Sequence, residues 1–285
     1  MNAANDEKEL ERQLEKRLNG IDIPPCPTIL LDIQQELEKE TQNQREIARL
    51  ISRDVALSGQ IMLVVNSSAY SGGQKINSIV QALNILGVRQ VFNLVITQLL
   101  KVSLSGDSAM PMERFWETSA LTARLAAELA RRLRCIRPDL AYTFGLFHDC
   151  GIPLLMKRFP QVRSVLAEAN ASEDGRFTDV EERHLGTNHA IVGYFLARRW
   201  RLSVDIAEAI LHHHDYHFIF GAGDLPPDSR RLIALTVLAE HIIRLQAGDS
   251  VNQEWHKAAP YACQLFNLSL GAVDDLVEDM CDWQG

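Results

Sequence analysis

The sequence lacks the features of a secreted or membrane-spanning protein. Its five cysteines are far apart and form no CxxC pair, which indicates free thiols in a reducing compartment rather than a disulfide framework. No stretch approaches the roughly 18 consecutive apolar residues that a membrane span needs, and the charged N-terminus has no apolar core for a signal peptide. We therefore expect a cytoplasmic protein without a membrane partner.

Positive charge and glycine-rich loops are also scarce. The chain has 29 lysines and arginines against 37 aspartates and glutamates, a net charge of −8, which argues against a broad surface for nucleic acid. No strand–glycine-rich turn–helix unit is present, which argues against a Rossmann or P-loop site, and no repeat of fixed period indicates a solenoid. The remaining composition, 46% apolar and 23% charged residues, is typical of a globular protein with a sizeable core.

Apolar residues recur at helical spacing along most of the chain, as at Leu57, Ile61 and Val65. Residues 88–104 are richer in β-branched side chains, but the length of this segment and its lack of alternation favour a buried helix. The best internal boundary is the Ser-, Gly- and Pro-containing segment 105–111. The pattern predicts an all-α fold with an N-terminal and a C-terminal helical module.

Polar residues mark several of the expected helix ends. Ser78 can cap a helix that stops at Gly87. Asp54 and Asn66 are interpreted as caps or as buried groups that organise a turn, because buried polar groups need hydrogen-bond partners.

Two metal-competent side chains, His148 and Asp149, close a stretch that otherwise has the character of a buried helix. Neighbouring helical residues point about 100° apart, so this pair cannot enclose an ion without ligands from other helices. Imidazole and carboxylate mixtures suit Zn, Mn or Fe. Further histidines gather downstream: His184, His189, His212, His213, His214 and His217.

Both features also have a structural interpretation. A triple histidine near the end of a helix can satisfy terminal carbonyls and the helix dipole. Asp149 comes shortly before Gly151 and Pro153 and can serve as a turn residue alone. Because spacing does not show convergence, the residues by themselves leave a shared metal pocket and separate helix-end roles as open alternatives.

Several short motifs follow one another in a characteristic order, at residues 23–27, 50–57, 65–70, 82–87, 115–119, 145–151, 185–193, 200–202 and 209–214. Together they resemble the HDOD domain, the HD-related output domain of bacterial signalling proteins, over roughly residues 20 to 245. The resemblance implies an HD-domain/PDEase-like helical bundle with an N-terminal helical subdomain. We expect an N-terminal helix over 1–22, an HDOD domain over 23–245 (N-terminal module 23–108, HD-like module 109–245) and a C-terminal helical extension over 246–285.

The resemblance also implies a metal site for one or two divalent ions (Fe, Mn, Ni or Zn), or a vestige that holds none. Two positions depart from the catalytic pattern: Thr118 occupies the place of the first histidine, and Glu240 replaces a late aspartate. A threonine hydroxyl is a poor ligand for such ions, so we expect weakened binding and lost catalysis. The candidate metal ligands are His148, Asp149, His189, His213, His214 and Glu240.

The function implied is that of a non-catalytic or degenerate signalling module that binds a protein partner, or a small-molecule or nucleotide ligand. About 20 residues precede the matching region and about 40 follow it, so we expect the signal to come from outside this chain. The alternative is a metal-dependent phosphohydrolase acting on a nucleotide or phosphoester, with Asp149 as its catalytic residue.

Overall fold

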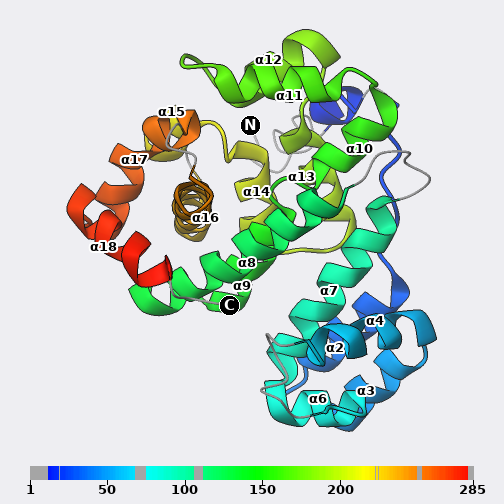
Figure 1. The fold of residues 1–285 in the computed structure, drawn as a ribbon. Helices are drawn as coiled ribbons and strands as arrows, with labels where there is room; N and C mark the ends of the chain where they lie inside the picture. The colour runs from blue at the N-terminus through cyan, green and yellow to red at the C-terminus, as the bar shows by residue number, and fades with distance from the viewer. Residues whose placement is uncertain are drawn as a thin grey trace, which may run out of the picture. The chain divides into compact units, whose positions relative to one another are not determined.

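The computed structural model describes residues 12–18, 20–67, 75–105, 112–221, 223, 225–248 and 252–281. Within these ranges the chain forms helices and turns and no strand (Figure 1). The expected all-α class is therefore confirmed. Among the described helices, none combines the length and apolarity needed to cross a bilayer.

The described residues divide into two compact units: those between Pro24 and Met112 form the smaller one, and those up to Ile23 join those from Glu113 onward in the larger one. The smaller unit is held together by a core of aliphatic side chains, among them the fully buried Ile33 and Ile61. Its helices are α2 (Thr28–Leu37), α3 (Gln44–Ser52), α4 (Val55–Val65), α6 (Ile79–Leu86) and α7 (Val88–Ser105).

The helix ends of the smaller unit follow the polar residues that mark them in the sequence. The backbone N–H of Leu57 donates to Asp54 Oδ1 at 2.9 Å, which caps α4. Asn66 bonds both backbone groups of Ile76, at 2.8 and 2.9 Å. Helix α6 begins after Ser78 and ends before Gly87, whose φ of 82° is the left-handed conformation that glycine adopts without strain. These predicted caps, and the buried helix α7, are confirmed.

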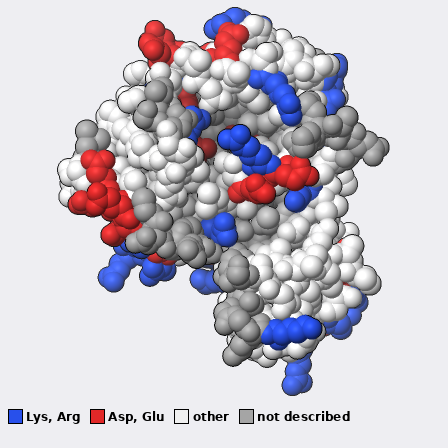
Figure 2. Space-filling view, in the orientation of Figure 1, with Lys and Arg blue, Asp and Glu red and all other residues white. Residues whose placement is uncertain are grey.

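The larger unit packs its helices around Phe144, Phe147 and Trp200, all fully buried. Helix α8 lies along α9, α16 packs against both, and α13 packs between α10 and α14. Exposed acidic residues gather over the last described helix (Figure 2). The helices are α8 (Glu113–Leu133), α9 (Pro138–Phe147), α10 (Gly151–Arg158), α11 (Val162–Ala171), α12 (Phe177–Leu185), α13 (His189–Arg199), α14 (Val204–His212), α15 (Tyr216–Phe220), α16 (Pro227–Gln246), α17 (Gln253–Phe266) and α18 (Leu270–Cys281).

Candidate metal centre

Five of the six candidate ligands lie at or next to helix ends inside the larger unit, and the sixth, Glu240, lies within a helix. His148 and Asp149 occupy the turn between α9 and α10, and His189 is the first residue of α13. The structure places His213 and His214 in the turn that follows α14, whereas Glu240 lies within α16. All six predicted residues are brought together in two groups that share Asp149.

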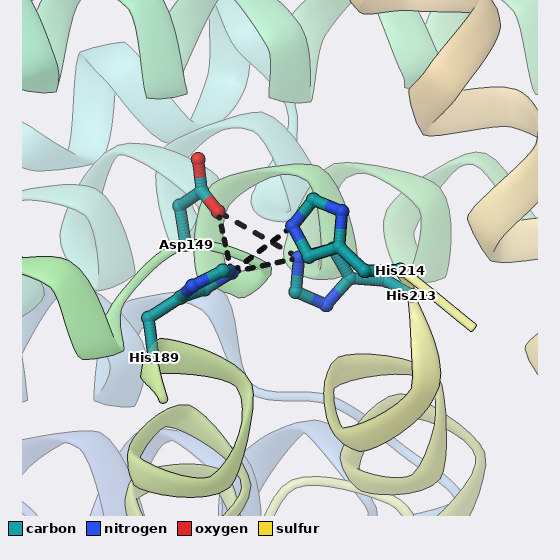
Figure 3. Close-up of side chains that lie close together, drawn as sticks. All are labelled: Asp149, His189, His213 and His214. Carbon is teal, nitrogen blue, oxygen red and sulfur yellow. Dashed lines mark hydrogen bonds and ion pairs between the residues drawn. The ribbon is translucent and has the colours of Figure 1, made fainter. Parts of the chain in front are cut away.

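The first group consists of Asp149, His189, His213 and His214, whose side chains point toward one another (Figure 3). His189 Nε2 lies 3.1 Å from His213 Nε2, 3.2 Å from His214 Nε2 and 3.3 Å from Asp149 Oδ1. His213 Nε2 lies 3.7 Å from the same carboxylate oxygen. Ligand atoms about 2.1 Å from a tetrahedral ion are about 3.4 Å apart, so these separations fit a cage for one ion.

The second group consists of His148, Asp149 and Glu240. His148 Nε2 lies 3.3 Å from Asp149 Oδ2 and 3.2 Å from Glu240 Oε1. Asp149 therefore directs Oδ1 to the first group and Oδ2 to the second. The two groups differ in their donors: the first offers three imidazoles and one carboxylate, the second one imidazole and two carboxylates.

The two groups together form one cluster with four histidines, His148, His189, His213 and His214. Each of these histidines has its Nδ1 hydrogen-bonded on the side away from the cluster. His148 Nδ1 donates to the carbonyl of Gly145 at 2.9 Å, and His213 Nδ1 donates to the carbonyl of Ile210 at 2.7 Å. A carbonyl can only accept, so Nδ1 carries a proton in both rings, and Nε2 holds the lone pair whenever the ring is neutral. His189 and His214 direct Nδ1 to carboxylates instead, Glu181 at 2.6 Å and Glu254 at 2.7 Å.

This hydrogen bonding leaves the Nε2 lone pairs of His189, His213 and His214 facing one another in a buried space. Facing acceptors repel unless a cation lies between them: a proton can bridge one pair of these nitrogens, whereas a divalent ion satisfies all three at once. Metal-binding histidines characteristically donate their other ring N–H to a carbonyl or carboxylate in this way. The residues therefore fit a metal ion.

Burial and nearby charges shift the pKa values of His148, Asp149 and His213. Burial disfavours the charged form of His148, but the carboxylates of Asp149 and Glu240 outweigh it and raise the pKa of His148 well above its usual value. Burial and the neighbouring His214 lower the pKa of His213 to about 3, which keeps its imidazole neutral. Burial favours protonation of Asp149, yet the adjacent His148 holds the pKa of this carboxyl well below its usual value.

A cavity of about 220 Å³ opens beside the second group. The predicted departure from the catalytic pattern, Thr118, lines this cavity from α8, and Thr122 lies one turn further along the same helix. The Thr122 hydroxyl is buried and has no hydrogen-bond partner among the described residues. Arg244, also in the wall, donates to Asn170 Oδ1 at 3.0 Å.

The remaining histidines of the downstream run lie outside both groups. His184 Nε2 lies 3.0 Å from a carboxylate oxygen of Glu168. His212 stacks on Phe218, with ring centroids 4.4 Å apart. His213 combines the two interpretations left open by the sequence, because its Nδ1 satisfies a helix-end carbonyl while its Nε2 faces the cluster.

Sequence reasoning missed the two carboxylates behind the histidines, Glu181 and Glu254. Glu181 is fully buried in α12, and Glu254 lies in the first turn of α17. A fully buried glutamate is rare unless paired, but burial is not visible in a single sequence. Nothing in the spacing of Glu254 points to His214, which is 40 residues away.

Comparison with known proteins agrees with the motifs. A family profile described as the HDOD domain matches residues 23–216. An uncharacterized protein of Treponema pallidum (strain Nichols) is 27% identical over 232 residues, which cover 80% of this chain and 44% of that protein. This chain spans less than half the length of the curated relatives it matches.

Solved structures share the fold. An HDOD domain protein of unknown function from Geobacter sulfurreducens superposes with a TM-score of 0.74 at 26% identity, covering 95% of this chain and 93% of that one. A protein named "Putative signal transduction protein" from Marinobacter aquaeolei VT8 has a TM-score of 0.71 at 22% identity, covering 98% of this chain and 63% of the other. At that identity the likeness shows a common fold alone.

Proposed function

Because this chain belongs to the HDOD domain family, we propose that it is a signal-transduction module that holds a divalent metal ion without hydrolysing a substrate. The observation that carries the proposal is the arrangement of His148, His189, His213 and His214. Each has its Nδ1 engaged by a carbonyl or carboxylate and its Nε2 directed at Asp149 or at the other imidazoles.

The first group is the stronger candidate for a resident ion. Asp149, His189, His213 and His214 supply four donors, which is the full ligand set of a closed structural site. Three imidazoles and one carboxylate suit Zn, Fe, Mn or Ni better than Mg or Ca, which prefer oxygen ligands. A bound ion would supply a fixed positive charge that joins the ends of α9, α13 and α14.

The second group supports the absence of turnover. His148, Asp149 and Glu240 provide three donors, and the lining of the same cavity includes Thr118 at the position where the resemblance places a histidine in catalytic relatives. A hydroxyl contributes little to holding such an ion. The module would then act through binding, with its signal supplied by a protein partner or by a small ligand.

One observation favours a phosphohydrolase as the second candidate. The His148, Asp149 and Glu240 group borders the cavity, and a site with three protein ligands and an open side has room for water and a phosphoester. In that case the Asp149 carboxylate would be indispensable, because it belongs to both groups.

Metal analysis combined with activity assays tests the proposal. The purified chain would be loaded in turn with Mn, Fe, Ni and Zn, dialysed, and analysed for bound metal. The same samples would be assayed on phosphomonoester and phosphodiester substrates. We expect at least one bound ion per chain and no turnover. Turnover that Asp149→Ala abolishes would establish the hydrolase instead, and the absence of bound metal under every condition would overturn both.

A further inference from the structure

A carboxylate beyond the matched residues 23–216 lies directly behind one candidate ligand. Glu254 Oε2 accepts hydrogen bonds from His214 Nδ1 at 2.7 Å and from the Tyr216 hydroxyl at 2.9 Å. Its other oxygen accepts from Lys257 Nζ at 3.1 Å. The Glu254 side chain is only 13% exposed, so these contacts are shielded from water.

The start of α17 holds Glu254 firmly in place. Asn252 caps the helix, with its side-chain oxygen accepting from the backbone N–H of Trp255 at 3.1 Å. Trp255 is buried and stacks on His241 of α16, with centroids 4.3 Å apart and planes 8° from parallel. Helix α17 packs along α16 and also contacts α11 and α15. The position of the carboxylate is therefore set by the docking of a whole helix.

The other ligands of the first group are oriented by groups closer in the chain. His213 is fixed by a carbonyl three residues earlier, and His189 by Glu181, eight residues earlier. His214 instead depends on a residue 40 positions later. Its imidazole also lines the cavity, whereas that of His189 is fully enclosed. Of the three imidazoles, that of His214 therefore depends most on the position of the C-terminal helices.

We propose that Glu254 is the positioning residue for His214, and that the docking of α17 thereby sets the metal affinity of the Asp149, His189, His213 and His214 group. This inference rests on the proposed metal-binding function. Docked, α17 holds His214 with its Nε2 toward the group; undocked, the ring keeps its stacking on Phe177, with centroids 4.7 Å apart, but loses the acceptor that decides which nitrogen faces the group, so one of four donors is weakened. By linkage, the ion strengthens the docking of α17 by the same factor. A partner that engages the C-terminal helices would thus change metal occupancy.

Zinc affinity of full-length variants tests this role. We expect Glu254→Ala to weaken binding by about 10- to 100-fold, the range found for partners behind metal-binding histidines. Glu254→Gln should lose less, because its amide oxygen still accepts from Nδ1. Glu278→Gln, in the exposed acidic stretch of α18, is the control and should bind as the unsubstituted protein does. Equal affinity in all three variants would overturn the inference.

Two further readouts separate positioning from a general loss of structure. Long-range ¹H–¹⁵N spectra of the metal-free protein should show the His214 proton on Nδ1, and this signature should change in Glu254→Ala while that of His148 does not. Zinc should slow hydrogen exchange in α17 of the unsubstituted protein but not of His214→Ala. Unchanged exchange in both would contradict the coupling.

The two proposals fail in distinguishable ways. If the unsubstituted chain takes up no metal, the metal-binding function fails and the role of Glu254 falls with it. If the unsubstituted chain binds zinc and Glu254→Ala binds it equally well, only the positioning role is overturned.

Discussion

Gly151 lies directly against the backbone of His189. A Cβ atom on Gly151 would be 2.0 Å from the His189 carbonyl oxygen, a distance that no side chain can occupy. This contact brings the turn that carries His148 and Asp149 onto the first residue of α13. The glycine is therefore a requirement of the cluster, because it lets two helix ends meet where their polar side chains converge.

Gly151→Ala should separate the turn that carries His148 and Asp149 from α13. The forced shift of two packed backbones should cost about 1–3 kcal/mol of unfolding free energy, as overpacking does elsewhere, and should weaken metal binding. Urea unfolding and zinc titration measure the two effects. Gly59→Ala on α4 is the control, since nothing lies within 4 Å of its Cβ position. A Gly151→Ala protein as stable and as metal-competent as the parent would refute this reasoning.

Thr118→His should add a fourth donor to the second group. The position lines the cavity with His148, Asp149 and Glu240, and an imidazole there replaces a hydroxyl that binds poorly. We expect a second ion bound on the order of tenfold more tightly, measured as metal per chain after dialysis. Glu117→His, one residue earlier on α8, turns its ring about 100° away and should have no such effect. The idea fails if both variants bind alike.

Asp149 and Glu240 should affect metal content differently. Because Asp149 belongs to both groups, Asp149→Ala should lose every bound ion, whereas Glu240→Ala should keep the ion of the first group. Inductively coupled plasma mass spectrometry of the two variants gives the comparison. Equal losses in both would show that the cluster holds a single ion using both carboxylates.

Metal removal should lower the stability of the protein. An ion that binds only the folded state adds about 2.7 kcal/mol to the unfolding free energy when its free concentration is 100 times Kd. A chelator should therefore lower the Tm of the unsubstituted chain by several degrees and leave the Tm of Asp149→Ala unchanged. A chelator effect of the same size in both proteins would mean that the ion binds elsewhere.

The helices and their caps could be predicted from the sequence because they depend on local interactions. Helix caps at Asp54 and Ser78 depend on neighbours within a few residues, so they can be recognised from the sequence alone. The His148-Asp149 pair and the downstream histidines stand out in the sequence as metal-competent side chains, and the resemblance of the ordered motifs implied which of them form one site. Spacing alone left open which of the three consecutive histidines join the metal site. His212 is the last residue of α14 and stacks on Phe218 instead.

The two carboxylates behind the histidines, Glu181 and Glu254, could not be predicted from the sequence, and the reason is physical. Glu181 lies eight residues before its histidine on a separate helix, and Glu254 lies 40 residues after its own. Such pairs arise from the packing of whole helices, which no local period encodes. The same applies to Gly151. That a side chain at this position would clash with α13 can be seen only from the packing of the two segments.

The most direct test of the metal centre is zinc K-edge X-ray absorption on protein loaded with less than one equivalent of zinc. We predict three imidazole nitrogens and one carboxylate oxygen at about 2.0–2.1 Å, from His189, His213, His214 and Asp149. His213→Ala should remove one imidazole from that shell. A shell of oxygen atoms alone, or one that His213→Ala leaves unchanged, would contradict the account.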